Sequence, residues 1–391
     1  MNDLCTDIGY MNVNKYGEQL CGDHVEVVHQ DENALVSVLA DGLGSGVKAS
    51  ILSTLTAKLI STMVANSLTL EECVEAMATT LPICKTRGVA YSTFTILRIT
   101  DKMEAELIQY DNPHVILLRG GKSLFYPEIT ETIGDKTIHK SKIQLREGDV
   151  FVMLSDGVVH AGVGLSLNFG WTRKEIAQYL EAVYDARLTA KSFSTMLLDR
   201  CCSLYEGKPG DDATVCAVKI RRRTPMNLLI GPPSNPADVS RMMALFFSKE
   251  GKHIVCGGTT SMLAADYLNK PLVTSLPSYI DPDIPPTAAI EGVDVATEGV
   301  ITLNRVLDYA RDYAGENTRY GAWCCSEDGA SKIARLLFEE ATDIGFFVGR
   351  AVNPAHQSPN LPITFSIKMN LVEELAQCLR GMGKKVKISY F

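Results

Sequence analysis

The order in which strand-like and helix-like segments follow one another changes once along this chain of 391 residues, and this change constrains the fold strongly. In the first part, apolar segments of strand length come in runs, with the helical patterns gathered between them. In the second part, strand-like and helical patterns alternate one by one. The basic, proline-containing segment RRRTP at 221–225 separates the two parts and is typical of a linker. A chain of this length fits two domains, and we predict them at 1–222 and 226–391.

Strand-like segments dominate the first part. They are apolar and bounded by turn residues, and they predict strands at 24–29, 34–40, 92–99, 105–110, 114–119, 149–155 and 213–220. Strands gathered in runs favour an α+β fold over an α/β fold. We therefore predict two antiparallel sheets with helices outside them.

Helical patterns are predicted at three places in the first part. The first spans 46–66, where apolar residues recur at four-residue spacing. The residues that share this predicted face are Ile51, Leu55, Leu59 and Met63. The second (69–77) and the third (172–182) each begin with a capping box, in which a threonine is followed three residues later by a glutamate.

The second part predicts an α/β domain. Its strand-like segments lie at 226–231, 253–258, 293–297, 343–349 and 385–391, and a helical pattern follows each of the first four. Such alternation is typical of a parallel or mixed sheet that is covered on both faces.

Composition narrows the setting in which the protein acts. No stretch approaches the ~20 uninterrupted apolar residues of a membrane span, and the first residues lack the basic start and apolar run of a secretory signal. We therefore expect a cytoplasmic protein that does not enter a membrane. A net charge of −8 argues against a nucleic-acid-binding surface.

The 11 cysteines lie mostly in apolar runs and lack the spacing of zinc ligands. This pattern favours free, buried thiols in a reducing compartment. A redox role for the adjacent Cys324 and Cys325 is the alternative.

Aspartates stand where predicted strands give way to turns, each next to a glycine: Asp23, Asp41, Asp156 and Asp211. Mg²⁺ and Mn²⁺ prefer oxygen ligands such as carboxylates and backbone carbonyls, and a neighbouring glycine lets the backbone approach an ion closely. A pair of such ions can polarise a phosphoryl oxygen and activate water. Asp-Gly is also a common turn dipeptide, so spacing alone leaves both interpretations open.

The motifs CGDH, LADGLGSGVKAS, STFTIL, YDNPHVILLRGG, LREGDVFVMLSDGVVHAG and GDDATVCAVKI follow one another between residues 10 and 221. Together they resemble the ordered motifs of the stage II sporulation protein E branch of the PPM phosphatases, the bacterial relatives of protein phosphatase 2C. The resemblance implies a β-sandwich of two antiparallel sheets flanked by helices and a centre of two Mn²⁺ or Mg²⁺ ions. It also implies a protein serine/threonine phosphatase in bacterial signalling, which hydrolyses phosphoserine or phosphothreonine with a metal-activated water.

The resemblance assigns roles to individual residues. Asp41 would bridge the two ions, and the carbonyl of Gly42 would contact one of them. The remaining ligands would be Asp23, Asp156 and Asp211, with Asp212 supporting them without binding an ion.

Two departures from the animal enzymes leave parts of the reaction open. Leu43 stands where those enzymes carry a histidine after the Asp-Gly pair, and no counterpart of their phosphate-binding arginine is visible. The general acid and the group that grips the phosphate are therefore unassigned. His24 and His114 are candidates by position, although a histidine beside a strand is more often structural.

The resemblance also bears on regulation and partners. In this family the helices after the ADG motif act as a switch for metal binding, and here these helices would be 46–66 and 69–77. The alternative is that the two helices only cover a sheet. A phosphorylated anti-sigma-factor antagonist, or a similar small signalling protein, would be the substrate. The competing function is a catalytically weak PPM-fold binding module that the second domain controls.

The second domain carries glycine-rich turns where strands lead into helices. Gly257, Gly258, Thr259 and Thr260 form one of these, and their backbone N–H groups would be able to hold an anion. Gly231 occupies a similar position after the first strand, and Glu298 would be able to supply an acidic group to a cleft. None of these turns follows a P-loop or dinucleotide-binding pattern, so ordinary helix starts are the alternative. We expect a regulatory module that binds a small ligand or a partner; a second enzyme and a homodimer-forming domain are the rival interpretations.

Overall fold

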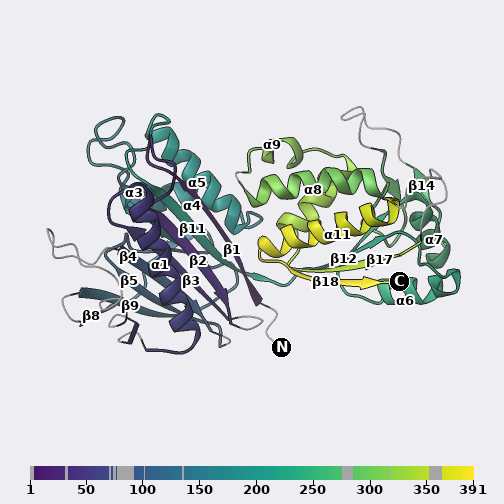
Figure 1. Ribbon diagram of the computed structural model, residues 1–391, viewed down its shortest axis with the longest axis horizontal. Helices are drawn as coiled ribbons and strands as arrows, with labels where there is room; N and C mark the ends of the chain where they lie inside the picture. The colour runs from purple at the N-terminus through teal and green to yellow at the C-terminus, as the bar shows by residue number, and fades with distance from the viewer. Residues whose placement is uncertain are drawn as a thin grey trace. The chain divides into compact units, whose positions relative to one another are not determined.

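The computed structural model describes the chain from residue 4 onward, except for 31–33, 70–71, 74–75, 77–91, 101, 134–135, 275–284, 316 and 352–362, and gives the backbone alone at 363–367. The chain divides into two compact units, Met1–Arg222 and Arg223–Phe391. Figure 1 shows the helices and strands of both units along the chain.

A six-stranded antiparallel sheet forms one layer of the N-terminal unit, in the order β2-β3-β4-β5-β9-β8. Its strands are β2 (Asp23–His29), β3 (Leu35–Gly42), β4 (Ser92–Ile99), β5 (Glu104–Tyr110), β9 (Lys136–Gln144) and β8 (Ile129–Ile133). The hairpin of β2 and β3 and the strand β4 lie where the sequence predicts them.

A five-stranded antiparallel sheet forms the second layer, in the order β1-β11-β10-β6-β7. Its strands are β1 (Leu4–Val13), β11 (Ala213–Arg222), β10 (Val150–Leu154), β6 (Ile116–Arg119) and β7 (Lys122–Leu124). Side chains from both sheets share one core, among them Leu39, Leu97, Phe151 and Val218. The two sheets therefore pack face to face as a sandwich.

Helices cover the outer faces of this sandwich. Helix α1 (Gly46–Ala65) packs on the first sheet. Helices α4 (Arg173–Val183) and α5 (Ala190–Leu204) pack on the second sheet, and the short α3 (Asp156–Val159) directly follows β10. The predicted α+β arrangement, two antiparallel sheets flanked by helices, is confirmed.

The buried face of α1 differs from the predicted one. Ile51 and Leu55 are 54% and 47% exposed, while small or short side chains such as Ala49 and Ala57, together with Ile60, are buried. The cause is a close approach of helix and sheet: a Cβ atom added at Gly42 on β3 would lie 2.2 Å from the backbone oxygen of Ala49. Small residues such as Ala49 permit this approach, and Ile51 and Leu55 are left exposed.

Within the part of the chain that is described, α1 is the one helix whose length and apolar composition would allow it to cross a membrane. Core helices of globular domains meet the same criteria, and α1 packs on a sheet. The helix predicted to follow it begins with the expected capping box, because Glu72 N–H donates to Thr69 Oγ1 at 3.3 Å and Thr69 N–H donates to Glu72 Oε2 at 2.7 Å. Most of the remainder of 69–77 lies outside the described residues.

The C-terminal unit is built on a seven-stranded sheet in the order β14-β15-β16-β13-β12-β17-β18. The strands β16 (Val295–Thr297), β13 (Lys252–Cys256), β12 (Pro225–Ile230), β17 (Asp343–Val348) and β18 (Lys385–Tyr390) are parallel. The short β14 (Val273–Thr274) and β15 (Ala288–Ala289) add an antiparallel edge. The first strand lies in the middle and the later strands extend outward on both sides, as in doubly wound α/β folds.

Helices lie on both faces of this sheet, as the alternation predicts. One face carries α8 (Val300–Ala314), α9 (Tyr320–Trp323), α10 (Gly329–Ala334), the π-helical turn η2 (Arg335–Glu340) and α11 (Ile363–Gly381), packed around the buried Trp323. The other face carries α6 (Val239–Phe247), preceded by the 3₁₀ turn η1 (Pro236–Asp238), and α7 (Gly258–Leu268).

Candidate functional site

The predicted aspartates come together at one end of the sandwich. Asp23 begins β2 and lies directly opposite Asp41 on β3. Asp156 follows the end of β10, and Asp211 precedes the start of β11, the antiparallel neighbour of β10. The charges of Asp23, Asp156 and Asp211 all act on the Asp41 carboxyl. Both sheets therefore contribute carboxylates to one place.

Burial makes this group of carboxylates unfavourable by itself. Asp23 is 4% exposed, and neither of its carboxylate oxygens has a hydrogen-bond partner. Burial, reinforced by the neighbouring aspartates, raises the pKa of Asp23 to about 7 and that of Asp41 to about 9, although the nearby Thr214 and Ser155 hydroxyls lower the pKa of Asp23 in part. An unpaired buried carboxylate is costly. A divalent cation among these oxygens would offset the cost, so the residues fit a metal centre.

The two adjacent aspartates before β11 differ in their surroundings. Asp212 is buried, its Oδ1 accepts the backbone N–H of Lys15 at 2.9 Å, and its Oδ2 has no partner. A Cβ atom added at Gly22 would lie 2.8 Å from that Oδ2, so this oxygen points toward the Gly22–Asp23 turn. Asp211 is less buried, and its Oδ1 accepts the N–H of Asp212 at 3.0 Å. The unpartnered oxygen makes Asp212 a second candidate ligand beside the predicted Asp211.

Glycine is required where the centre is most crowded. A Cβ atom at Gly157 would lie 2.1 Å from the backbone oxygen of Asp212, so only glycine lets the start of α3 touch the turn before β11. Gly42 and Gly157 therefore serve the close packing of backbone segments, whereas the close approach to an ion that the sequence predicts stays a prediction.

Sequence reasoning missed two basic residues beside the aspartates, Lys15 and His160. Lys15 and His160 both lower the pKa of Asp211 against the effects of burial and of Asp156, which raise it. The His160 Nδ1 lies 4.0 Å from Asp156 Oδ2, one helical turn further along the chain. The four-residue spacing between Asp156 and His160 is a usable sequence signal. No sequence signal points to Lys15, because it follows strand β1, which the sequence does not predict.

The two histidines that were candidates by position are held by glutamates. His24 Nε2 lies 3.0 Å from Glu26 Oε2, and His114 Nδ1 lies 2.8 Å from Glu128 Oε1. Neither contact involves a predicted metal ligand.

The glycine-rich turn of the C-terminal unit lies at the start of α7. Gly257 adopts φ +114° before the helix, and Gly258, Thr259 and Thr260 form its first turn. A Cβ atom at Gly299 would lie 3.5 Å from Gly257 Cα, so the starts of α7 and α8 lie together. Anion binding by this turn stays a prediction.

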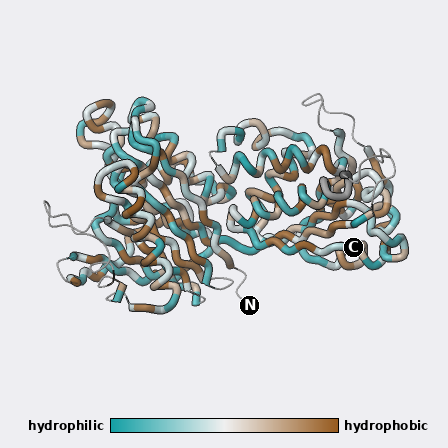
Figure 2. Tube along the Cα trace, viewed as in Figure 1, coloured by the Kyte–Doolittle hydropathy of each residue, from teal (hydrophilic) through white to brown (hydrophobic). Residues whose placement is uncertain are grey.

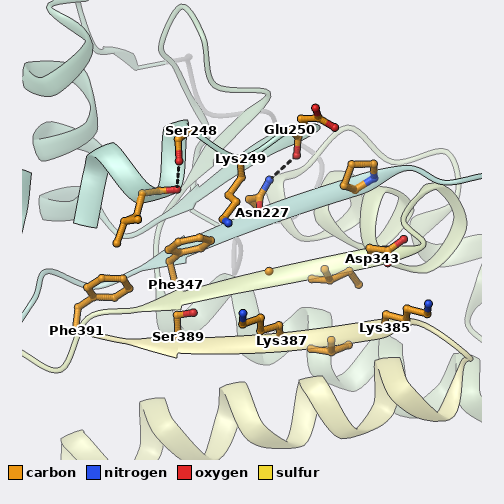
Figure 3. Close-up of a pocket in the computed structure, with 15 residues that line it drawn as sticks. Asn227, Ser248, Lys249, Glu250, Asp343, Phe347, Lys385, Lys387, Ser389 and Phe391 are labelled. Carbon is orange, nitrogen blue, oxygen red and sulfur yellow. Dashed lines mark hydrogen bonds between the residues drawn. The ribbon is translucent and has the colours of Figure 1, made fainter. Parts of the chain in front are cut away.

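A cavity of about 670 Å³ lies elsewhere in the same unit, over β12, β17 and β18 (Figure 3). Phe347 and Phe391 line one end, and the side chains of Lys385 and Lys387 follow along β18. Asn227 donates from Nδ2 to the backbone oxygen of Glu250 at 2.9 Å at its border. The residues of the glycine-rich turn do not line this cavity.

Comparisons with known proteins support a family for the N-terminal unit. Residues 31–221 match the family model of stage II sporulation protein E. None of the curated proteins matches the chain. The matched segment contains three of the predicted metal ligands, Asp41, Asp156 and Asp211. The fourth, Asp23, precedes the matched segment.

Three solved structures are similar to this chain. The phosphatase domain of the cell fate determinant SpoIIE from Bacillus subtilis is 17% identical, covering 57% of this chain and 96% of that one, with a TM-score of 0.46. The RsbU and RsbW domains of Rv1364c from Mycobacterium tuberculosis are 18% identical, covering 61% and 66%, with a TM-score of 0.45. The catalytic domain of the serine/threonine protein phosphatase PstP, in complex with two manganese ions, is 15% identical, covering 56% and 99%, with a TM-score of 0.39.

The family match ends at residue 221, next to the boundary between the two units. The C-terminal unit has no family assignment. The segment 31–221 therefore matches the family model of stage II sporulation protein E, the family that the ordered motifs of the sequence resemble.

Proposed function

We propose that this protein hydrolyses phosphoserine or phosphothreonine in a protein substrate, with two Mn²⁺ or Mg²⁺ ions held by the aspartates at the end of the sandwich. The observation that supports it is the convergence of Asp23, Asp41, Asp156 and Asp211 from both sheets, with the buried oxygens of Asp23 left unpartnered. This convergence occurs in a domain of a phosphatase family.

The donor set suits hard divalent cations. Asp41 and the carbonyl of Gly42 would hold the ions together with the other three aspartates, because carboxylate and carbonyl oxygens are the ligands these ions prefer. When bound, the ions supply a coordinated water of lowered pKa and polarise the phosphoryl oxygens. The protein's part is to fix the donors at strand ends, where the sheets prevent them from moving apart under mutual repulsion.

Two side chains near the aspartates, those of Lys15 and His160, would take the remaining roles in the proposed reaction. Lys15, whose charge acts on Asp211, would hold a phosphoryl oxygen. His160, half exposed beside Asp156, would donate a proton to the departing serine or threonine oxygen. These two residues would fill the roles for which the sequence offered no arginine or histidine in the expected place.

The test is turnover of a phosphoserine peptide by the full-length protein in Mn²⁺. We expect Asp41→Asn to lower kcat by about 10² to 10³, the usual loss when a group that stabilises the transition state is removed. Asp199→Asn, on the exposed side of α5, is the matched control and should retain activity. Undiminished turnover by Asp41→Asn would contradict the proposal, and an inert wild-type protein that binds phosphoprotein would favour a binding module instead.

We further propose that the substrate is a small cytoplasmic signalling protein of the anti-sigma-factor-antagonist kind, and that the C-terminal unit regulates the phosphatase. Membership of the family supports the first proposal. The proposal that the C-terminal unit is regulatory rests on two features of that unit: it has its own hydrophobic core, and it has a cavity lined by aromatic and lysine side chains. Removal of residues 223–391 tests it: regulation of phosphatase activity and oligomeric state should change, and unchanged values of both would refute a regulatory role.

A further inference from the structure

A second group of metal-ligand side chains lies in the N-terminal unit: His114, Glu128 and His139. One potential ligand atom from each residue lies within 4.8 Å of the others. No three of the aspartates lie this close to one another, nor does any other such group within the described residues. His114 Nδ1 is 2.8 Å from Glu128 Oε1, and His139 Nδ1 is 3.8 Å from Glu128 Oε2. The two imidazole rings are 4.8 Å apart. Glu128 therefore stands between two histidines.

The fold assembles this group at the places where the chain crosses between the sheets. His114 lies in the segment that leaves β5 of the first sheet for β6 of the second, and Glu128 lies in the segment that returns from β7 to β8. His139 lies on β9, between β5 and β8, strands that Figure 1 shows at one side of the unit. A bound ion would join both crossings to β9.

Neighbouring side chains hold this arrangement in place. The Gln109 amide donates to Glu128 Oε1 at 3.4 Å, and the Arg173 guanidinium donates from Nε to the backbone oxygen of His114 at 2.8 Å. Partners of this kind orient metal ligands and are a regular part of metal sites. The ligand side chains are between 25% and 39% exposed, so an ion can enter from solvent.

This group is separate from the aspartates. In the first sheet β9 is three strands away from β3, which carries Asp41, and three strand spacings amount to roughly 14 Å. Metal–ligand bonds are only about 2 Å long, so the two groups cannot share an ion. Their chemistry differs too, because imidazole suits Zn²⁺, Co²⁺ and Ni²⁺, whereas all-oxygen sites suit Mg²⁺ and Mn²⁺.

We propose that His114, Glu128 and His139 bind one divalent transition-metal ion, with Zn²⁺ as the principal ion and water as the fourth ligand. A tetrahedral zinc site with bonds of about 2.0 to 2.1 Å places its ligand atoms about 3.3 Å apart. The histidine nitrogens lie 2.8 Å from Glu128 Oε1 and 3.8 Å from Glu128 Oε2, and the three ligand atoms lie within 4.8 Å of one another. Binding therefore requires the side chains to draw together around the ion. The ion stabilises the N-terminal unit by joining the two crossings between the sheets to β9.

The experiment uses the full-length protein in excess Mg²⁺, which occupies the aspartate centre, and titrates Zn²⁺ while thermal unfolding is followed. At a hundredfold excess of free Zn²⁺ over the dissociation constant, the midpoint should rise by about 5 to 10 °C. Co²⁺ in place of Zn²⁺ should give visible absorption bands that report nitrogen ligands. His114→Ala/His139→Ala should abolish both responses, and Glu128→Gln should weaken binding at least about tenfold.

His29→Ala is the matched control, since His29 is an exposed histidine of the same sheet outside the group. It should respond as the wild type does. If the double variant is unstable without metal, His139→Gln alone replaces it. An equal Zn²⁺ response in the histidine variants, or none in the wild type, would overturn the proposal and leave a hydrogen-bonded His–Glu–His group. The experiment measures thermal unfolding and Co²⁺ absorption and not phosphatase activity. Its result therefore does not depend on whether the proposed function is correct.

Discussion

At the scale of single residues, the main feature is a cluster of carboxylates in which several buried oxygens have no hydrogen-bond donor. Asp23 has no partner for either oxygen, and one oxygen of Asp212 has none. These groups repel one another in a buried place, where charges interact strongly. This repulsion therefore lowers the stability of the folded protein when no metal ion is bound.

Asp23→Asn should accordingly stabilise the metal-free protein and remove its response to Mn²⁺. The substitution deletes a buried charge next to Asp41 while keeping the size of the side chain. Thermal unfolding with a chelator and then with Mn²⁺ measures both effects. A variant that is less stable without metal, or that gains as much from Mn²⁺ as the wild type does, would contradict the assignment.

Lys191 on α5 gives a pH-dependent prediction away from the centre. Burial lowers the pKa of Lys191 to about 8 from 10.5, so the folded protein loses this proton at a lower pH than the unfolded chain does. Stability linked to Lys191 therefore increases as the pH rises from about 8 to 10.5. Lys191→Met should be more stable than the wild type below pH 8, and the difference should shrink over this range.

Urea unfolding at several pH values checks this prediction. Lys174→Met, an exposed position on α4, serves as the control and should show no such trend. A stability difference between Lys191→Met and the wild type that stays constant from pH 7 to pH 10 would rule out the burial of a charged lysine.

At the scale of elements, α1 shows how packing overrides a helical pattern. The helix begins and ends where predicted, but Ile51 and Leu55 of the predicted apolar face are exposed. The close contact of β3 with the helix at Ala49 favours a different buried face, which includes Ala57 and Ile60. Periodicity identifies a helix and its apolar stripe, yet the shape of the opposing surface decides which face is buried.

Substitutions on the two faces of α1 distinguish them. Ile60→Ala should cost about 2 to 4 kcal/mol of unfolding free energy, because Ile60 is fully buried. Leu55→Ala should change it by no more than about 0.5 kcal/mol, as at an exposed position. Chemical denaturation measures both changes in unfolding free energy. A large loss for Leu55→Ala alone would show that the face predicted from the sequence is the buried one.

The same comparison shows what sequence can predict here. Apolar alternation and capping boxes located β3, β4 and α4 within about a residue or two. Strand β1 was missed, since LCTDIGYMNV mixes polar and apolar residues without alternation, and α5 was missed because serines and cysteines interrupt its apolar pattern. Resemblance supplied the aspartates, whereas the contacts of Lys15 with the turn before β11 join residues 197 positions apart and have no local signal.

At the scale of the whole molecule, each unit has its own hydrophobic core. The core clusters of the sandwich contain only residues before 223, and those of the parallel sheet contain only residues after it. Separate cores are the mark of domains that fold independently.

Residues 1–222 expressed alone should therefore fold and keep the Mn²⁺ response of the full chain. Calorimetry of this fragment should show one cooperative transition whose midpoint rises with Mn²⁺. Aggregation of the fragment, with recovery only when residues 223–391 are added, would show that the units depend on each other.

The junction between the units has a mechanical consequence. β11 ends at Arg222 and β12 begins at Pro225, so only two residues separate the last strand of the N-terminal unit from the central strand of the C-terminal unit. β11 is clamped between two neighbouring strands, and its opposite end adjoins Asp211 and Asp212. A force on β12 would therefore be transmitted along the ten residues of β11 to the turn that carries Asp211 and Asp212.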